Sequence, residues 1–198
     1  MEEKRPDVDE AADQRADLEH LDPEGDVMLK LEDGEAARNF LVSSKILSLA
    51  SPVFKTLFAP SFSEGTKLAE LGYIEVSLHD DNPCAMRSML AILHYQDATE
   101  LDGADPKAIA TFAICCDKYD CVKPIRPWVE AWFHNRLCIS TAEDYGLILL
   151  AAHLFRSSEQ FSSISAQIIR KMSPEFSTTW EANDILAFLP SIVIGETE

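Results

Sequence analysis

The stretch "NFLVSSKILSLASPVFKTLF" (Asn39–Phe58) changes its hydrophobic period part-way along. Phe40 and Val42 lie two positions apart and therefore share one face of an extended chain, which is typical of a half-buried strand. From Ser43-Ser44 onward the apolar residues follow helical spacing, and either serine can cap a helix. Ser51-Pro52 then places an N-cap residue before an N1 proline, which indicates a second helix start. We therefore predict a strand that leads directly into two short helices, with no catalytic side chain among them.

Two other segments alternate in the same way as a strand. Residues 26–31, "DVMLKL", carry an apolar side chain at every second position and are followed by Asp33-Gly34, a strong hairpin signal. Residues 38–42 therefore return as the partner strand. Residues 73–78, "YIEVSL", predict a third strand, and the polar residues 60–72 before it predict a loop.

Helical spacing of apolar residues dominates the chain after residue 80. The predicted helices begin at Asp80–Pro83, at Asp105-Pro106, near Pro124, at the capping boxes Ser140/Glu143 and Ser157/Gln160, and at Asn183. The predicted order is two strands, two helices, a third strand and then helices alone. This order predicts an α+β fold, in which a helical cluster flanks a small three-stranded sheet.

Length and charge indicate one domain with an acidic tail. The chain has 198 residues, of which 46% are hydrophobic, and a net charge of −17. Residues 1–26 hold eleven acidic residues against three basic ones and very few large apolar side chains. We predict that residues 1–24 are disordered, because such a segment cannot offset the entropy cost of ordering. An acidic surface repels phosphates, so we do not expect nucleic-acid binding.

The sequence also argues against membrane insertion and secretion. The longest nearly apolar run, Tyr145–Phe155, has about eleven residues, whereas a membrane-spanning helix needs roughly 20. The N-terminal segment lacks the apolar core of a secretory signal. The five cysteines do not have the spacing of a disulfide framework. We therefore expect an intracellular protein, in the cytoplasm, the nucleus or both.

No residue pattern points to catalysis or to a cofactor. The segment "CCDKYDC" (Cys115–Cys121) suggests a metal site, but it lacks the second pair of ligands that zinc sites usually have, so packing is the better interpretation. The sequence contains no G-x-S-x-G, no H-E-x-x-H and no glycine-rich phosphate loop. We expect a protein without enzymatic activity, metal or cofactor.

The ordered set of residues resembles the BTB/POZ domain, particularly that of many fungal proteins. The residues that carry this resemblance are Asp26-Val27, Phe40 with Val42, Ile46-Leu47, Ser51–Phe54, Leu57-Phe58, Glu64-Gly65, Asp80–Met86 and Asp117–Cys121. The resemblance covers about residues 25–137, and residues 138–198 look like the C-terminal helical extension of these proteins. It implies a non-enzymatic module that binds other proteins.

The resemblance also implies where a partner would bind. Phe62-Ser63-Glu64 is similar to the hydrophobic-x-acid motif by which cullin-adaptor BTB domains hold the ubiquitin-ligase scaffold. Tyr73 and the helix near Tyr119–Pro124 would be neighbours in that surface. The alternative is that the Phe62 ring folds onto its own domain. A substrate adaptor of a cullin-based ubiquitin ligase is thus the second function that we consider, beside a general interaction module.

Asp26 bears on self-association. In dimeric BTB domains an aspartate at this place on the first strand shares a charged pocket with a basic residue that follows the second strand. Here Ser44 occupies the place of the basic residue. The resemblance therefore predicts Asp26 as a contact residue but not a homo-oligomer held together by that charged pocket.

Overall fold

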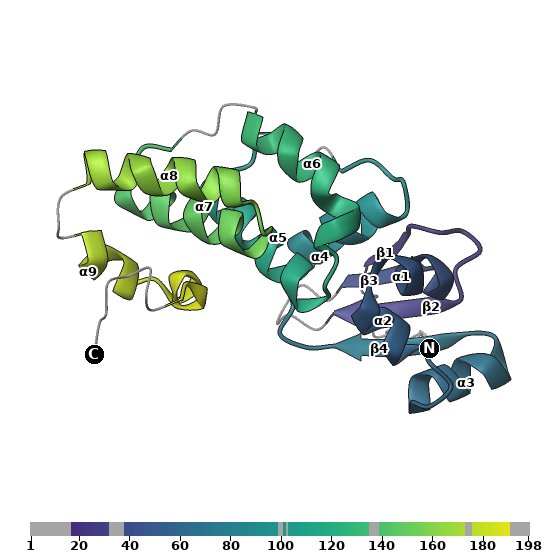
Figure 1. The fold of residues 1–198 in the computed structure, drawn as a ribbon. Helices are drawn as coiled ribbons and strands as arrows, with labels where there is room; N and C mark the ends of the chain where they lie inside the picture. The colour runs from purple at the N-terminus through teal and green to yellow at the C-terminus, as the bar shows by residue number, and fades with distance from the viewer. Residues whose placement is uncertain are drawn as a thin grey trace, which may run out of the picture.

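The computed structural model describes residues 17–31, 38–98, 101, 103–134, 139–172 and 176–190 (Figure 1). The strands are β1 (Asp17–His20), β2 (Val27–Leu31), β3 (Arg38–Val42) and β4 (Ile74–Leu78). The helices are α1 (Ser44–Ala50), α2 (Pro52–Leu57), α3 (Ser63–Leu71), α4 (Pro83–Leu93), α5 (Pro106–Lys118), α6 (Val122–His134), α7 (Ala142–Leu154), α8 (Ser158–Lys171), α9 (Phe176–Glu181) and the 3-10 helix η2 (Asp184–Phe188). The α+β class is confirmed.

The sheet has four strands in the order β1-β3-β2-β4 and not the three that the sequence predicted. β2 and β3 form the expected antiparallel hairpin, with Leu29 opposite Phe40. β1 and β4 run parallel to β3 and β2 on the two edges. The segment 1–24 was predicted to be disordered, but residues 17–20 form β1 and residues 21–24 form the turn that follows it. Residues 1–16 lie outside the described part of the chain.

The edge strand β1 escaped prediction because little of its stability comes from its own apolar side chains. Backbone pairing to β3 holds it, and the carboxylate of Glu19 forms an ion pair of 2.8 Å with Arg87 on α4. Leu18 remains partly exposed, whereas Leu21, just beyond the strand, is buried. A four-residue strand of this kind has no hydrophobic alternation to reveal it.

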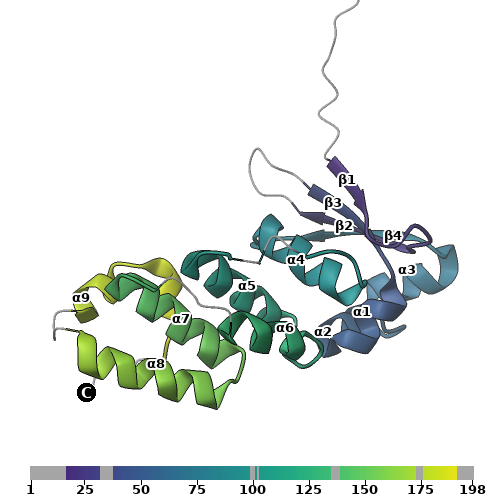
Figure 2. The same cartoon turned by 90° about the horizontal axis from the view of Figure 1, so that it is seen from above.

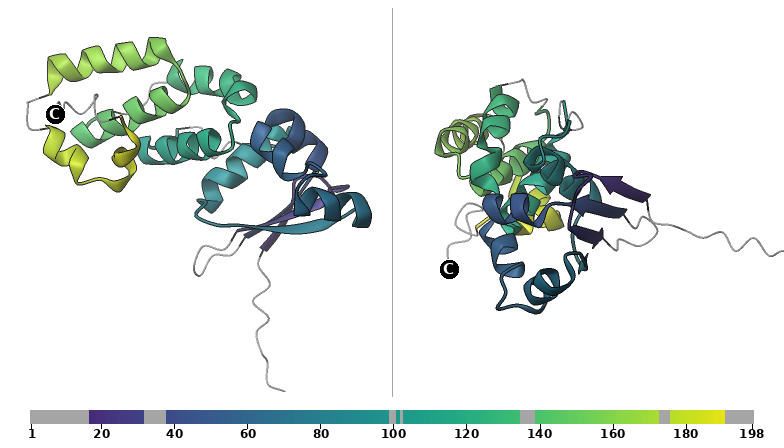
Figure 3. Two further views of the ribbon diagram at one scale, coloured as in Figure 1. Left: turned by 60° about the horizontal axis from the view of Figure 1, so that its bottom comes forward. Right: turned by 90° about the vertical axis from the view of Figure 1, so that its right-hand side faces the viewer.

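One face of the sheet forms one side of the hydrophobic core. The helices α1, α2 and α4 lie over this face (Figures 2 and 3). Its fully or nearly fully buried side chains are Val27, Leu29, Leu31, Phe40, Val42, Ile74 and Val76. The alternation read from the sequence is thus the alternation between core and solvent, as expected for a sheet covered on one side.

The C-terminal helices share a core with the first part of the chain. α7 packs along α5, with α8 and α9 on its other sides (Figure 1). The ring of Phe155, after α7, lies 6.1 Å from Phe112 on α5 and 6.5 Å from Phe133 on α6. The predicted boundary near residue 137 falls in residues 135–138, which lie outside the described part. The contacts of Phe155 show that the C-terminal helices pack directly on α5 and α6.

A helix stands where the sequence predicted a loop. α3 begins after Phe62 and ends at Gly72, whose φ of 72° is the left-handed conformation of a glycine C-cap. Most of its side chains face solvent, so residues 60–72 show no apolar period. Gly65 is buried against the backbone of Ala59. The position has no room for a side chain, because a Cβ there would lie 2.0 Å from the carbonyl oxygen of Ala59. The short helix α9 was not predicted either.

Several helix caps differ by one or two residues from the predicted ones. Thr141 and Asp144, not Ser140 and Glu143, form the capping box of α7, with N–H···O distances of 3.0 and 2.8 Å. Ser157 precedes α8 without a side-chain cap bond. Asn82 caps α4 in place of the aspartates before it. The caps of the central stretch hold: Ser43 begins α1 and Ser51 begins α2.

Candidate protein-interaction surface

The segment around α3 presents a mixed apolar and acidic surface. We call Phe62, Glu64, Leu71 and Tyr73 the α3 platform. Phe62 precedes α3, Leu71 ends it, and Tyr73 follows the Gly72 turn into β4. The side chains of Phe62, Leu71 and Tyr73 are 47%, 71% and 40% exposed. Exposed apolar groups rimmed by polar ones are typical of contact surfaces.

Backbone hydrogen bonds fix Phe62 at the start of α3. Its N–H donates to the carbonyl of Ala59 at 2.9 Å, and its own carbonyl accepts from the N–H of Thr66 at 2.9 Å. The backbone of Phe62 is extended, as in an N-cap residue, and its side chain makes no cap bond. Phe62 is therefore held in place by its backbone while about half of its ring faces solvent, which disfavours the alternative of a ring folded onto the domain.

Glu64 presents a charged carboxylate in the first turn of α3. The hydroxyl of Ser63 donates a hydrogen bond of 2.8 Å to Glu64 Oε2. This bond, followed by the backbone N–H of Glu64 itself, lowers the pKa of the carboxyl group below its ordinary value. The structure thus brings together the aromatic ring and the ionised acid that the sequence pointed to.

Tyr73 keeps its phenol in the neutral form. Partial burial and then the neighbouring carboxylate of Glu75 raise the pKa of Tyr73, and Lys30 counteracts this only in part. Glu75 in turn forms an ion pair with Lys30 on β2. The phenol can donate or accept a hydrogen bond at the edge of the platform.

Tyr119 does not belong to an exposed surface, contrary to the prediction. Its side chain is 4% exposed, and its ring stacks on Phe54 with 4.6 Å between the centroids. The hydroxyl donates to Asp81 Oδ2 at 2.7 Å, and the carbonyl of Tyr119 accepts from the hydroxyl of Ser51 at 2.5 Å. The resemblance placed Tyr119 in the partner surface, but Phe54 of the short helix α2 covers its ring. Tyr119 is a core residue.

Asp26 also serves the fold of its own chain. Both of its carboxylate oxygens accept hydrogen bonds from Ser44, one from the hydroxyl and one from the backbone N–H. Asp26 is only partly exposed. The sequence correctly named Ser44 as its partner, and the geometry shows a closed pair that ties β2 to α1 rather than an open charged pocket.

Sequence reasoning missed a second exposed apolar feature. A groove of about 320 Å³ lies where α1, the end of α4 and the start of α6 meet, and we call it the α1 groove. It is lined by Ile46, Leu49, Ala50, Ile92, Leu93, Tyr95, Pro124 and Trp128. Leu49 is 83% exposed and Tyr95 is 89% exposed. Leu49 belongs to the helical spacing that follows Ser44, which predicted burial, and no local signal indicated that its side chain stays exposed.

Comparison with protein families decides what this arrangement is. A model of the BTB/POZ domain matches residues 18–131, which include all of the sheet except the first residue of β1, the α3 platform and every residue that lines the α1 groove. The chain belongs to the BTB/POZ family. The match extends seven residues further toward the N-terminus than the predicted start at residue 25, and so takes in most of β1. No curated protein matches the chain.

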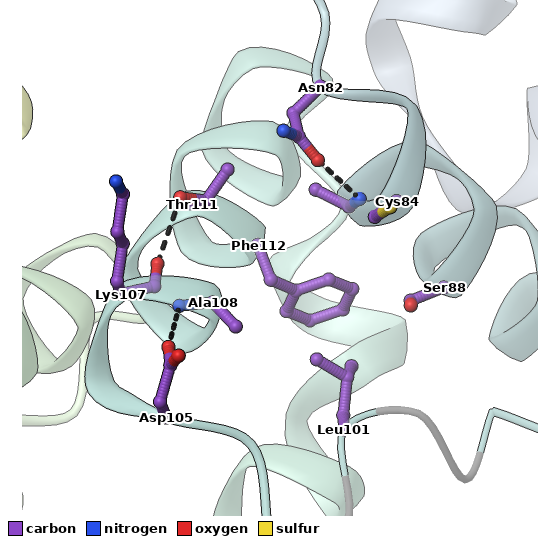
Figure 4. A pocket seen from close by; sticks show the side chains of 10 residues that line it. Asn82, Cys84, Ser88, Leu101, Asp105, Lys107, Ala108, Thr111 and Phe112 are labelled. Carbon is purple, nitrogen blue, oxygen red and sulfur yellow. Dashed lines mark hydrogen bonds between the residues drawn. The ribbon is translucent and has the colours of Figure 1, made fainter. Parts of the chain in front are cut away.

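This BTB/POZ chain also has a cleft of about 290 Å³ between the first turns of α4 and α5 (Figure 4). Figure 4 shows that two of its polar side chains cap helices: Asn82 accepts from the N–H of Ala85 at 3.0 Å, and Asp105 accepts from the N–H of Ala108 at 2.7 Å. Phe112 lies between them. The cleft brings together helix caps and no nucleophile–base pair.

Metal ligands are not gathered in the described part of this BTB/POZ chain. No group of three or more His, Cys, Asp or Glu side chains there is arranged to hold a metal ion. Cys115, Cys116 and Cys121 are buried, and burial raises the pKa of each thiol, that of Cys121 to about 12. Protonated thiols are poor metal ligands. Among the described helices, none is long and apolar enough to cross a bilayer.

Proposed function

We propose that this BTB/POZ chain recruits a partner protein through the α3 platform. The family is a protein–protein interaction module. The observation that carries the proposal is the Phe62 ring, 47% exposed and fixed by its backbone next to the ionised Glu64. We propose further that the chain acts by binding and performs no catalysis.

The chemistry of the platform suits a contact site. A rigidly held aromatic side chain supplies large contact area at small entropy cost, and such residues often dominate binding energy. A charged carboxylate beside it orients the partner and rejects acidic surfaces. Leu71 and Tyr73 extend the apolar area from the other end of α3, so the partner would lie along this helix.

A cullin scaffold is the second, more specific candidate for the partner. Phe62-Ser63-Glu64 has the order of a hydrophobic-x-acid motif, and the first and last of these side chains are accessible at the start of one helix. An adaptor needs another surface to hold its substrate. We propose the α1 groove or the helices of residues 140–190 for that purpose.

One binding experiment tests both proposals. The full chain is immobilised, and purified cullin N-terminal domain is added in one arm and a cell lysate in the other. The variant Phe62→Ala/Glu64→Ala is compared with Val53→Ala/Glu24→Ala, which removes a similarly exposed apolar side chain and an exposed acid away from α3. We expect the first variant to lose bound protein and the control to keep it.

The two arms separate the outcomes. Absence of cullin binding by the wild-type chain contradicts the adaptor role. Binding that survives the platform substitutions contradicts the α3 platform as the contact site, whichever partner is retained. Self-association is measured separately, by light scattering at micromolar concentration, and a strict monomer would exclude a homo-oligomer.

A further inference from the structure

The ring of His94 joins two elements that lie far apart in the sequence. His94 follows α4 and is 6% exposed. Its Nε2 atom lies 3.1 Å from the backbone nitrogen of Ser43, the N-cap residue of α1. Its Nδ1 atom lies 2.8 Å from the carbonyl oxygen of Leu90. The ring thus bridges α4 to the first residue of the strand-to-helix turn.

These two contacts define one protonation state. The N–H of Ser43 is a donor, so Nε2 must accept and carries no proton. The carbonyl of Leu90 is an acceptor, so Nδ1 must carry the proton and donate. The ring is therefore the neutral Nδ1–H tautomer, and little of it is exposed to water that could satisfy a different arrangement.

A second proton would break the bridge. It would sit on Nε2 and point at the N–H of Ser43, so that two donors face each other in a buried place. The imidazolium would also be buried, and burial is the main reason why the pKa of His94 lies below its ordinary value. The neighbouring residue Ser44 keeps its two hydrogen bonds to Asp26.

The charges near the ring oppose this penalty only weakly. The titratable groups on the elements that meet there are Asp22 in the β1–β2 turn, Asp26 before β2, Lys45 on α1, and Tyr95 and Asp97 after α4. Of these, Asp22 attracts a proton to the ring, but its Oδ1 also accepts from the N–H of Glu24. Lys45 would repel a proton on the ring, but its side chain is exposed, so solvent screens its charge.

We infer that His94 is a proton-sensitive latch for α1: the neutral ring holds Ser43, and the protonated ring releases it. α1 has only seven residues, and a helix this short depends on tertiary contacts for its stability. Release of its N-cap residue loosens Ile46 and Leu49, which line the α1 groove. Mild acidification thus changes the groove before it unfolds the domain. This inference does not depend on the α3 platform.

The test follows individual groups in the full-length chain by NMR between pH 7.5 and pH 5. The ring nitrogens of His94 report the tautomer, and amide hydrogen exchange, corrected for its intrinsic pH dependence, reports α1 and α7 separately. We expect Nε2 without a proton at pH 7.5. On acidification the Ser43 amide should lose roughly fivefold or more in protection, the worth of about one hydrogen bond, while α7 keeps its protection.

Two variants complete the test. His94→Gln offers an amide oxygen where Nε2 was, which accepts from Ser43 but does not titrate, so protection of α1 should become independent of pH. His153→Gln changes an exposed histidine and should behave as the wild type does. A proton on Nε2 at pH 7.5, equal loss of protection in α1 and α7, or an unchanged pH response in His94→Gln would each overturn the latch. The His94 tautomer and the exchange of α1 and α7, both measured on the wild-type chain, test the latch even if His94→Gln does not fold.

Discussion

The hydroxyl of Ser44 donates a hydrogen bond of 2.6 Å to Oδ2 of Asp26, while the backbone N–H of Ser44 donates to Oδ1 at 2.7 Å. A single carboxylate therefore binds both donors of one residue, 18 positions along the chain. The pair joins the start of β2 to the first turn of α1. This hydroxyl–carboxylate pair is complete within one molecule.

Asp26→Ala should lower the free energy of unfolding by about 2–3 kcal/mol, because two hydrogen bonds to a charged acceptor are lost. Ser44→Ala should cost about 1 kcal/mol, because the backbone N–H keeps its partner. Urea unfolding measures both, with Glu24→Ala, an exposed acid nearby, as the control. Equal stability of Asp26→Ala and the control would show that the pair does not stabilise the turn.

Tyr119→Phe should destabilise the fold without affecting partner binding. The hydroxyl of Tyr119 donates to Asp81, whose side chain is almost fully buried and otherwise pairs with Lys118 at 2.8 Å. Loss of this donor should cost about 1–2 kcal/mol, measured by chemical denaturation. Tyr95→Phe removes an exposed hydroxyl and should be neutral. A binding defect at temperatures where Tyr119→Phe is folded would show that Tyr119 contributes to partner binding.

Gly146→Ala should disturb the C-terminal extension. A Cβ at this position in α7 would lie 2.8 Å from Trp180 Cε2 and Nε1 and from Leu186 Cδ1. Overpacking of this kind costs about 1–3 kcal/mol. It should also lengthen the 2.8 Å bond from the indole N–H of Trp180 to the carbonyl of Ala142. Thermal melting and tryptophan fluorescence measure the two effects.

Gly72→Ala is the matched comparison for Gly146→Ala. No atom lies near a Cβ at Gly72, but its φ of 72° is unfavourable for alanine. It should cost about 1 kcal/mol through the backbone alone and leave the fluorescence of Trp180 unchanged. A fluorescence change in Gly72→Ala, or none in Gly146→Ala, would contradict the packing argument.

Stability should fall as pH drops below about 6.5. Burial lowers the pKa of His94 in the folded chain from its ordinary value of 6.5, so the unfolded chain binds more protons in this range. The contribution of His94 is complete above pH 6.5 and is lost, by at most about 1.4 kcal/mol per pH unit, as pH falls toward the folded pKa. Urea titrations at pH 7.5 and 5.5 measure it, and His94→Gln should reduce the difference.

Thiol labelling should divide the described cysteines into two classes. Cys84 is exposed on the first turn of α4, whereas Cys115, Cys116 and Cys121 are buried with raised pKa values. We expect a disulfide reagent to modify Cys84 within minutes and the buried thiols only after unfolding. Peptide mapping by mass spectrometry checks this, in a Cys138→Ser background. Fast labelling of a buried thiol in folded protein would mean that the α5 end opens.

The elements that were predicted correctly carry their own local signal. The stretch from Phe40 to Phe58 holds a period of two, then a period of 3.6, and two serine caps, all of which depend on neighbours in the chain. Two of the missed elements, β1 and α3, lack an apolar period because few of their side chains face the core. α3 depends on the close approach of Gly65 to the backbone of Ala59, and the spacing of apolar residues in the sequence does not predict this contact.

The sequence by itself determined the α+β class, the β2–β3 hairpin, a helix start at Ser43 or Ser44, a second start at Ser51, and the family to which they belong. It also placed an aromatic residue and an acid together at Phe62 and Glu64. Only the tertiary structure decided which side chains remain accessible: Tyr119 is covered by α2, whereas Leu49 and Tyr95 are left open. The physical reason is that periodicity and capping arise from contacts within a few residues. Exposure instead depends on which distant segment comes to lie against a side chain.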